Sequence, residues 1–345
     1  MTLRVGIVGA GAAGIGAADA LRDADADVTI VEKSRGVCGR AATRRKNGCR
    51  YEHGANYIKD PDERTEALIR DLGEDGLVDV EEPVWVFDAD GEVAEGDDDG
   101  AHKWTWTAGI TQLGKRLLAR TDATVRRTTR VESVTRDESA ATWTLTDADG
   151  GTHGPFDRLL LTPPAPQTAA LLRATDWDDG RLDDVVAAVE DVSYRTIRTF
   201  VLHYPFRESY PWYGLVNVDK AHEVGWLSRE ECKDGHVPDG ESLLIAQMSP
   251  EWSAARYDDP LDEAGDDAAA LVAALLDDDR YADPDWVDDQ GWRYALPNGG
   301  VDADALAAVE DAGLFFAGDW LVGEGRVHRA LWNGHDAGER IAASE

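Results

Sequence analysis

The stretch Gly9-Ala10-Gly11-Ala12-Ala13-Gly14 follows an apolar run at residues 3–8 and opens a run of small residues that extends to position 21. The apolar run predicts a buried strand, and the second run predicts a helix. Residues 28–31 predict another short strand, with the acid Glu32 at its end. A strand, a glycine-rich turn, a helix and a second strand with a terminal acid form the pattern of an α/β, Rossmann-type dinucleotide-binding fold.

Each glycine of this stretch has its own expected role. Gly9 permits a tight turn, Gly11 lets the backbone approach a pyrophosphate, and Gly14 lets the helix pack closely on the sheet. The first helical amides, at Ala12 and Ala13, are expected to direct their N–H groups at the phosphates. These residues therefore belong to the predicted cofactor site.

The loop after the second strand indicates which dinucleotide is bound. It reads Glu32-Lys33-Ser34-Arg35-Gly36-Val37-Cys38-Gly39-Arg40. Glu32 has the spacing of an acid that accepts hydrogen bonds from ribose hydroxyls, which favours FAD or NAD over a 2′-phosphorylated ligand. Glycines for close approach and arginines for phosphate charge suit a long, extended ligand. We expect cofactor contacts from Glu32, Lys33, Gly39 and Arg40.

The far end of the chain carries a second signature. Residues 313–320 predict an apolar strand that ends in Gly318-Asp319, and Arg326 and Val327 lead into a helix expected over residues 329–343. An aspartate beside a glycine at a strand end suits a hydrogen bond to ribityl or phosphate-proximal groups, and an amide near a helix N-terminus can stabilise negative charge. Two such signatures at opposite ends of one chain predict bound FAD.

These motifs resemble those of the amine-oxidase-type flavoproteins. Residues 32–45 look like the second FAD signature of that superfamily, and the order of their residue types is most similar to that of the renalase-like branch. One departure is visible, because Cys38 stands where the family usually has the first of two paired glycines. The resemblance implies cofactor contacts for Gly318, Asp319, Arg326 and Val327.

The resemblance continues between the two ends. His53-Gly54-Ala55-Asn56-Tyr57 looks like the family's Gly-Ala-x-Tyr segment near the flavin, and Gly291-Trp292-Arg293-Tyr294 has a counterpart in the renalase-like group. Val131 stands where the family places a residue against adenine. The resemblance thus adds Gly54, Ala55, Asn56, Tyr57 and Val131 to the expected cofactor contacts.

The implied architecture is that of the amine oxidase and p-hydroxybenzoate hydroxylase-like folds. A Rossmann-type FAD-binding domain (residues 1–60, 106–162 and 290–345) is interrupted by an α+β substrate domain (residues 61–105 and 163–289). Helices are expected at residues 64–72, 109–120, 167–172 and 264–276, and strands at 124–145, 156–162, 196–204, 213–218, 223–227 and 242–248. Alternation at Leu243, Ile245 and Gln247 predicts a sheet with one face on a core and the other on a cavity.

The composition is strongly acidic. Over 345 residues, 68 acids stand against 35 bases, for a net charge of −33. Such a surface repels nucleic acid and anionic lipid, so neither is expected as a partner. Aspartate runs at residues 97–99, 277–279 and 288–289 are expected in turns and on helix faces. The composition is typical of a surface adapted to the salt-saturated cytoplasm of an extreme halophile; a partner-binding acidic face is the alternative.

The three cysteines, Cys38, Cys49 and Cys232, follow no metal-ligand spacing, and no metal site is expected. Their odd number fits a reducing compartment. Since no cysteine follows Cys232, the C-terminal thioether of some amine oxidases cannot form, and we expect non-covalent FAD. The first strand begins at Leu3 and no apolar run approaches the length of a membrane span, so a cytoplasmic protein is expected.

The expected activity is that of an FAD-dependent oxidoreductase. The resemblance implies a renalase-like oxidase that returns 2- or 6-dihydro isomers of NAD(P) to the aromatic dinucleotide, by hydride transfer to flavin N5 and reoxidation by oxygen to give hydrogen peroxide. Candidate substrate-site residues are Tyr57, Gln247, Trp292 and Tyr294, and candidate phosphate-binding residues are Arg195, Arg198, Arg229 and Arg293. Two alternatives remain open: an amine or polyamine oxidase, and a non-catalytic flavin-binding electron carrier or scaffold.

The acidic composition predicts a salt requirement. At molar salt the Debye length falls to roughly 3 Å, which screens repulsion among the acids. We expect the melting temperature to rise when KCl is raised from about 0.1 to about 3 M. A melting temperature that does not change over this range would contradict the prediction.

Overall fold

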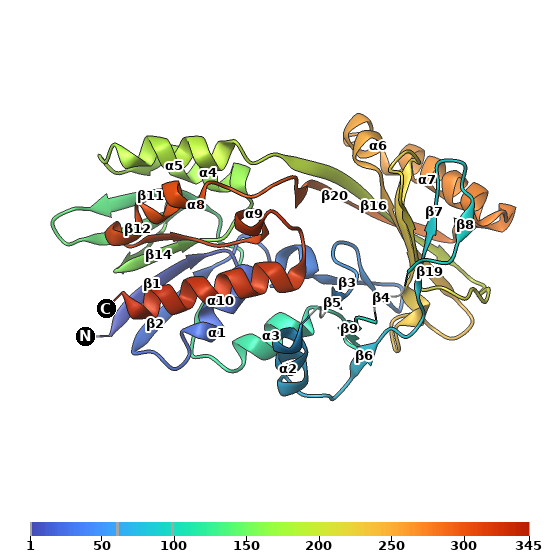
Figure 1. Ribbon diagram of the computed structural model, residues 1–345, viewed down its shortest axis with the longest axis horizontal. Helices are drawn as coiled ribbons and strands as arrows, with labels where there is room; N and C mark the ends of the chain where they lie inside the picture. The colour runs from blue at the N-terminus through green and yellow to red at the C-terminus, as the bar shows by residue number, and fades with distance from the viewer. Residues whose placement is uncertain (1, 60–61, 98–99, 345) are drawn as a thin grey trace. The chain divides into compact units, whose positions relative to one another are not determined.

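The computed structural model describes residues 2–59, 62–97 and 100–344, and the chain divides into two compact units (Figure 1). Unit 1 comprises Met1–Ala41, Leu113–Tyr194 and Leu296–Glu345, and unit 2 comprises Ala42–Gln112 and Arg195–Ala295. The boundary expected at residues 60 and 61 lies outside the described residues. The boundaries of the two units thus differ from those expected for the FAD-binding and substrate domains. The roles of these domains remain a proposal.

Unit 1 is built on a five-stranded parallel sheet in the order β10-β2-β1-β14-β21. Its strands are β1 (Leu3–Val8), β2 (Ala26–Val31), β10 (Thr124–Arg126), β14 (Arg158–Leu161) and β21 (Leu314–Phe316). The strand order reverses between β1 and β14, and in such folds ligands bind beyond the carboxyl ends of the strands at this point. The glycine stretch directly follows β1, so the predicted Rossmann-type α/β fold is confirmed.

Two helices of unit 1, α1 (Ala12–Ala20) and α10 (Val327–Ala343), lie side by side at very short range (Figure 1). A Cβ atom built on Gly334 would lie 1.9 Å from the carbonyl oxygen of Ala13, and one built on Gly16 would lie 2.3 Å from a carbonyl oxygen of α10. Carbon and oxygen atoms that are not bonded do not approach so closely in a packed interior. Only glycine therefore fits at these contacts.

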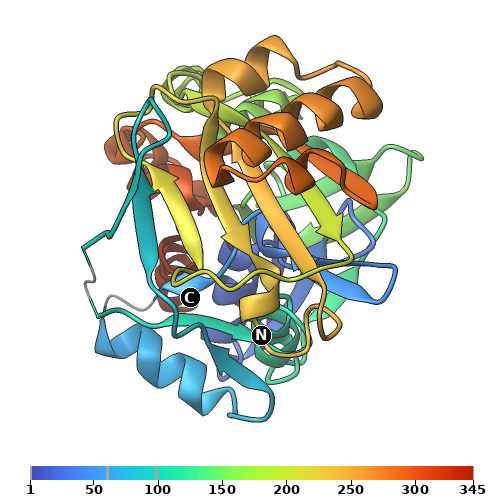
Figure 2. The same ribbon diagram turned by 90° about the vertical axis from the view of Figure 1, so that its right-hand side faces the viewer.

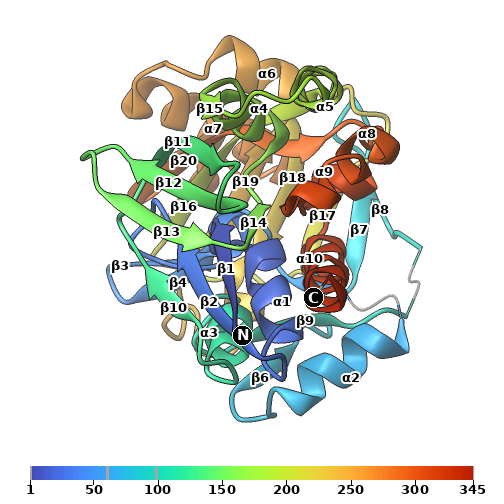
Figure 3. The same cartoon turned by 90° about the vertical axis from the view of Figure 1, so that its left-hand side faces the viewer.

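The rest of unit 1 covers this sheet (Figure 3). A second sheet has the order β13-β12-β11-β15, with β11 (Val131–Asp137), β12 (Thr142–Asp147), β13 (Thr152–Phe156) and β15 (Thr175–Asp176). The remaining helices are α3 (Gln112–Leu118), α4 (Ala165–Arg173), α5 (Arg181–Glu190), α8 (Ala303–Ala307) and α9 (Asp319–Val322). Trp143, Phe316 and Trp320 are buried in the apolar cluster between these elements.

Unit 2 is dominated by a seven-stranded sheet in the order β20-β16-β19-β18-β17-β7-β8. Its strands are β7 (Val84–Phe87), β8 (Val93–Ala94), β16 (Tyr194–Tyr204), β17 (Gly214–Asn217), β18 (Val224–Arg229), β19 (Ser242–Met248) and β20 (Trp286–Pro297). Helices α6 (Pro250–Ala255) and α7 (Leu261–Leu276) lie over one face, as Figure 2 shows. Phe200, Leu202 and Ala246 pack in the core beneath them.

Smaller elements complete unit 2. A β3 (Thr43–Lys46) and β4 (Cys49–Glu52) hairpin accompanies a three-stranded sheet of β5 (Ile58–Lys59), β9 (Lys103–Trp106) and β6 (Leu77–Asp79), with α2 (Glu63–Asp71). On the face of the large sheet opposite the helices, Leu243 and Ile245 pack against Cys49 and Tyr51. The two faces of β19 thus contact different clusters, but both are packed, and the face predicted to line a cavity is buried at Leu243 and Ile245. Within the described ranges, no helix is long and apolar enough to cross a membrane.

The structure differs from the expectations at several elements. Helix α5 and strand β20 were not predicted, and α10 begins at Val327 because Arg326 keeps an extended backbone. Asp288 and Asp289 lie inside β20 rather than in a turn, since Arg44 binds Asp288 at 2.9 Å and Arg198 binds Asp289 at 2.8 Å. In the run at residues 97–99, positions 98 and 99 lie outside the described residues.

The contact between α1 and α10 predicts a specific loss of stability. Alanine at position 334 would gain helix propensity of about 1 kcal/mol, but it must displace the Ala13 carbonyl, and overpacking of this kind costs about 1–3 kcal/mol. Because the 1.9 Å contact places the cost at the upper end of this range, we expect Gly334→Ala to lower the free energy of unfolding by about 2 kcal/mol in molar KCl. The measurement is denaturant unfolding.

Gly36→Ala serves as the matched control for Gly334→Ala. An added Cβ at Gly36 meets no heavy atom within 4 Å. We expect this variant to retain the stability of the parent protein. Equal stability of the two variants would show that α10 moves away from α1 at no cost.

Candidate functional site

The turn after β1 is tight and glycine-dependent. Gly9 has a φ of 103°, and its amide donates to the Val31 carbonyl at 2.9 Å. A Cβ on Gly14 would lie 2.0 Å from the Gly9 carbonyl oxygen, so this glycine lets α1 pack on the strand. At Gly11, by contrast, an added Cβ meets no heavy atom within 4 Å. The tight turn at Gly9 and the close packing at Gly14 are as predicted, and the approach of a pyrophosphate to Gly11 stays a prediction.

Space at Gly11 adjoins an uncapped helix N-terminus. Gly11 is the N-cap residue of α1, and within the described part of the chain no side chain caps the helix and no acid lies in its first turn. The first amides of such a helix, here at Ala12 and Ala13, provide partial positive charge. The arrangement suits an anion such as a phosphate.

Glu32 is buried at the end of β2, with 7% of its surface exposed. Its Oε2 accepts a hydrogen bond from the Ala10 amide at 2.7 Å, and its Oε1 accepts one from the Ser34 amide at 2.7 Å. A carboxylate has about four acceptor positions, so two bonds leave capacity for hydroxyl donors. The adjacent Lys33 is exposed, and its ammonium lies 3.2 Å from Oε1 of Gln167.

The second loop runs beside the glycine turn. Cys38 forms a bridge with Gly11, and its amide donates to the Ala10 carbonyl at 2.8 Å. Its φ is 76°, the left-handed region that favours glycine, which explains why the family usually has glycine here. The thiol is buried against Gly114, and burial raises its pKa to about 12. Cysteine therefore fills the position with a strained backbone and an inert thiol.

The two signatures from opposite ends of the sequence meet within unit 1. The guanidinium of Arg40 donates to Oδ1 of Asp319 at 2.7 Å, and only 5% of the Asp319 side chain is exposed. Gly318, which precedes it, has a φ of 154°, and its amide donates to Oδ1 of Asn333 at 2.9 Å. Arg40 and Asp319 thus fix the second loop against the end of β21.

The start of α10 offers a second set of helical amides. Arg326 is the N-cap residue with an extended backbone, Val327 is the first helical residue, and within the described ranges no side chain caps this end. Val131, another predicted contact, is the half-buried first residue of β11. Unit 1 thus brings together helix N-termini, a buried carboxylate and an open glycine, which fit a dinucleotide.

In unit 2, two predicted substrate-site residues hold the segment of residues 53–57. The side-chain amide of Gln247 donates to the Gly54 carbonyl at 2.6 Å, and the indole N–H of Trp292 donates to the His53 carbonyl at 2.8 Å. Gln247 lies on β19 and Trp292 on β20, so two strands far apart in sequence converge on one backbone segment.

Tyr57, Tyr294 and the four candidate arginines lie in different surroundings. Tyr57 is half-buried, with ring centroids 6.0 Å from Tyr213 and 6.4 Å from Trp226, and Tyr294 is half-buried on β20. Arg198 and Arg229 are each 3% exposed and bind Asp289 and the Trp212 carbonyl. They are structural, which corrects the prediction for these two, whereas Arg195 is half-buried and Arg293 exposed.

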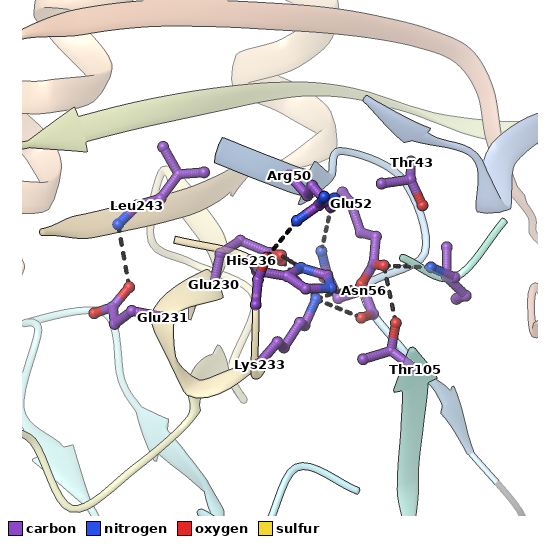
Figure 4. A network of polar contacts seen from close by, with 12 residues as sticks. Thr43, Arg50, Glu52, Asn56, Thr105, Glu230, Glu231, Lys233, His236 and Leu243 are labelled. Atoms are coloured by element: carbon purple, nitrogen blue, oxygen red, sulfur yellow. Dashed lines mark hydrogen bonds and ion pairs between the residues drawn. The ribbon is translucent and has the colours of Figure 1, made fainter. Parts of the chain in front are cut away.

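A fully buried network of charges was not predicted (Figure 4). The Lys233 ammonium lies 2.6 Å from Oε2 of Glu52 and 2.5 Å from Oε1 of Glu230, and it donates to the Asn56 carbonyl at 2.7 Å. Oε2 of Glu230 lies 2.8 Å from Nδ1 of His236. All four ionisable side chains are inaccessible to solvent. The sequence contains one signal for this network. Glu52 directly precedes the predicted segment of residues 53–57, and lysine is rare in the chain.

The network is held in a charge-balanced state. Nε2 of His236 faces the Trp106 carbonyl at 3.0 Å and must donate to it, while Nδ1 faces the Glu230 carboxylate, so a proton lies between them. Although burial opposes its charge, the bond to Glu230 raises the pKa of His236, and the Lys233 and His236 charges hold the pKa of Glu230 below its usual range. Two acids and two bases therefore cancel.

The pKa of His53 is shifted in the opposite direction to that of His236. His53 is 6% exposed, and burial together with the nearby Arg44 charge lowers its pKa to about 4. Arg44 itself binds Asp288 at 2.9 Å, and the Tyr51 hydroxyl donates to the same carboxylate at 2.5 Å. The imidazole of His53 is therefore neutral and a weak base at neutral pH.

Among the described residues, three clusters contain donor types that metals use, and one of them, His335, Asp336 and Glu339, lies on α10 with two exposed acids. In the cluster of Glu52, Glu230 and His236, both carboxylates already bind the Lys233 ammonium, which takes the place of a cation. Cys49, His203 and Glu241 bring donor atoms within 4.8 Å of one another. There Nε2 of His203 lies 2.9 Å from the Glu241 carboxylate, a contact that an imidazole N–H makes without a metal. All three cysteines are free thiols.

Comparisons with known proteins agree with this architecture. A family model described as an NAD(P)-binding Rossmann-like domain matches residues 7–72, and one described as flavin containing amine oxidoreductase matches residues 94–342. The solved structure of wild-type putrescine oxidase bound to putrescine is similar, with 16% identity, a TM-score of 0.74 and coverage of 99% of each chain.

Two further solved structures have the same fold. Cyclohexylamine oxidase from Brevibacterium oxydans IH-35A has 16% identity and a TM-score of 0.73, with 99% of each chain covered. Reduced UDP-galactopyranose mutase has 12% identity and a TM-score of 0.78, with 100% of this chain and 96% of that chain covered. One fold thus serves proteins whose names describe different reactions.

The low pKa of His53 predicts acid sensitivity. The unfolded chain takes up a proton on this residue near pH 6.5, whereas the folded chain does so only near pH 4. The stabilisation is therefore complete above pH 6.5 and is lost as the pH falls toward 4, by about 3 kcal/mol in total. We expect His53→Gln to reduce the dependence of unfolding free energy on pH in this window. Parallel pH curves for the two proteins would contradict the assignment.

Proposed function

Because the chain belongs to the family of flavin-containing amine oxidoreductases and is a flavin-dependent oxidoreductase, we propose that it holds FAD non-covalently and oxidises dihydronicotinamide dinucleotides. The proposed substrates are the 2- and 6-dihydro isomers of NAD(P), as in the renalase-like branch. Oxygen is the proposed electron acceptor, with hydrogen peroxide as the product.

The proposed cofactor site rests first on unit 1. The open space at Gly11 and the uncapped start of α1 would receive the pyrophosphate, and the buried Glu32 carboxylate would bind ribose hydroxyls. Asp319, held by Arg40, would accept a hydrogen bond from the ribityl chain or its phosphate-proximal groups. Non-covalent attachment is supported by the sequence, in which no cysteine follows Cys232.

The remaining predicted contacts complete the proposed site. Gly9, Ala12, Ala13, Gly14, Lys33, Gly39, Val131, Gly318, Arg326 and Val327 belong to the dinucleotide and flavin contacts, and Gly54, Ala55, Asn56 and Tyr57 to those near the flavin ring. When bound, the flavin supplies the acceptor for a hydride and returns the electrons to oxygen. The protein then has to hold the donor ring in line with that acceptor.

The observation that carries the substrate proposal is the state of His53. A dihydronicotinamide ring needs no protein base, because its own nitrogen lone pair drives the loss of hydride. An alkylammonium must first lose a proton, but a histidine with a pKa of about 4 cannot take it at neutral pH. Gln247 and Trp292, the residues that hold the same segment, do not ionise.

The second candidate function is amine or polyamine oxidation. The description of the matched family favours it, and the acidic composition suits a cationic substrate. Tyr57 and Tyr294 would then contribute aromatic rings around the substrate amine.

An anaerobic titration distinguishes these functions. We expect the flavin absorbance of the holoprotein in molar KCl to bleach within seconds of adding 2- or 6-dihydro-NAD(P), and to return, with one hydrogen peroxide per flavin, when oxygen is readmitted. Putrescine and cyclohexylamine are the comparison substrates. Bleaching by amines alone would establish the second candidate, and bleaching by none of these compounds would establish a flavin protein without turnover of either class.

A further inference from the structure

The buried network in unit 2 has a direct contact with the backbone expected at the flavin. Lys233 is fully buried, and it donates to the Asn56 carbonyl as well as to two carboxylates (Figure 4). The Asn56 side chain donates in turn to the Glu52 carbonyl at 2.8 Å. Asn56 is therefore held from both its backbone and its side chain.

The carbonyl contact determines how the peptide bond after Asn56 is oriented. In a planar trans peptide the carbonyl and the following N–H point in opposite directions. With its carbonyl bound to the ammonium, the Asn56–Tyr57 peptide has its N–H directed away from the charge network. Rotation of this peptide would leave a buried ammonium with one fewer partner, which is costly in a protein interior.

Glu52 is itself firmly held. Its Oε1 accepts hydrogen bonds from the Thr105 hydroxyl at 2.9 Å and from the Ile110 amide at 2.6 Å. The network thus connects β4, β9 and the segment after β18 to one peptide of residues 53–57. A buried charge such as the Lys233 ammonium must be compensated by partner groups, whereas apolar side chains in a core need no such partners. The presence of this charge therefore indicates a role other than holding the core together.

We propose that Lys233 is a positioning residue of the flavin site, which fixes the Asn56–Tyr57 peptide in the orientation that the cofactor requires. This inference rests on the proposed function, because it assumes that residues 54–57 contact the flavin. Lys233 acts through the Asn56 carbonyl and has no proposed contact with the substrate.

The matched variants are Glu230→Gln and the double variant Lys233→Met/Glu230→Gln. Both remove the Glu230 charge, and both keep the network neutral: in the single variant Glu52 balances Lys233, and in the double variant it balances His236. Only the double variant loses the bond to the Asn56 carbonyl. The comparison therefore separates the loss of the Lys233 ammonium, with its contacts to the Asn56 carbonyl and to Glu52, from the loss of the Glu230 charge.

We expect both variants to unfold cooperatively, with the amides of residues 54–57 exchanging hydrogen at least tenfold faster in the double variant than in Glu230→Gln. The dissociation constant for FAD should rise about ten- to a hundredfold in the double variant, as expected for loss of a charged hydrogen bond, and its bound flavin should have an altered visible spectrum and reduction potential. Glu230→Gln should retain the parent values.

The outcomes separate this inference from the function on which it rests. Failure of the parent protein to take up FAD overturns both. Uptake by the parent, with the same spectrum, potential and affinity in the two variants, overturns the positioning role alone, whatever their melting temperatures. If the double variant does not fold, hydrogen exchange of the parent decides: amides of residues 54–57 that exchange as fast as those of exposed loops, with and without FAD, overturn the inference.

Discussion

The architecture of unit 1 depends on close contacts between backbones. Strand β1, helix α1 and helix α10 meet at positions where no side chain fits. Gly14 brings α1 onto the end of β1, and Gly16 and Gly334 bring α1 and α10 together, each at distances that exclude a Cβ atom. Helix α1 of the first motif and helix α10 of the last motif are thereby held at one sheet. The glycine turn after β1 and the start of α10 owe their positions to this contact.

Unit 2 is organised by a different constraint, the balance of charge away from water. In a chain with a net charge of −33, most acids are exposed, yet Glu52 and Glu230 are enclosed with Lys233 and His236 in equal numbers. Breaking one partner of such a group commonly costs several kcal/mol, about 3–5 for a buried pair. The segment of residues 53–57 is attached to this group on one side and to Gln247 and Trp292 on another.

The sequence was sufficient to predict those parts of the fold that local pattern encodes. The glycine spacing around Gly11 and the acid at Glu32 predicted the Rossmann-type sheet, because backbone geometry there admits few residue types. Cys38 shows the limit of that reasoning. Its backbone has a left-handed φ, but cysteine commonly adopts ordinary backbone angles, so the residue type alone did not predict this conformation. Strand β20 escaped prediction because Asp288 and Asp289 have the composition of a turn, and only their arginine partners, distant in sequence, make them part of a sheet. The Lys233 network escaped for the same reason, as its members are brought together by tertiary structure alone.

The depth of the three thiols has a practical consequence. Cys38 belongs to unit 1 and Cys49 to unit 2, and both are buried, while Cys232 is partly accessible. A thiol reagent can modify a buried cysteine only when the surrounding structure opens, so the labelling rate measures the free energy of that opening. The protein therefore carries a natural, mutation-free reporter in each unit, with which the response of the two units to salt can be followed separately.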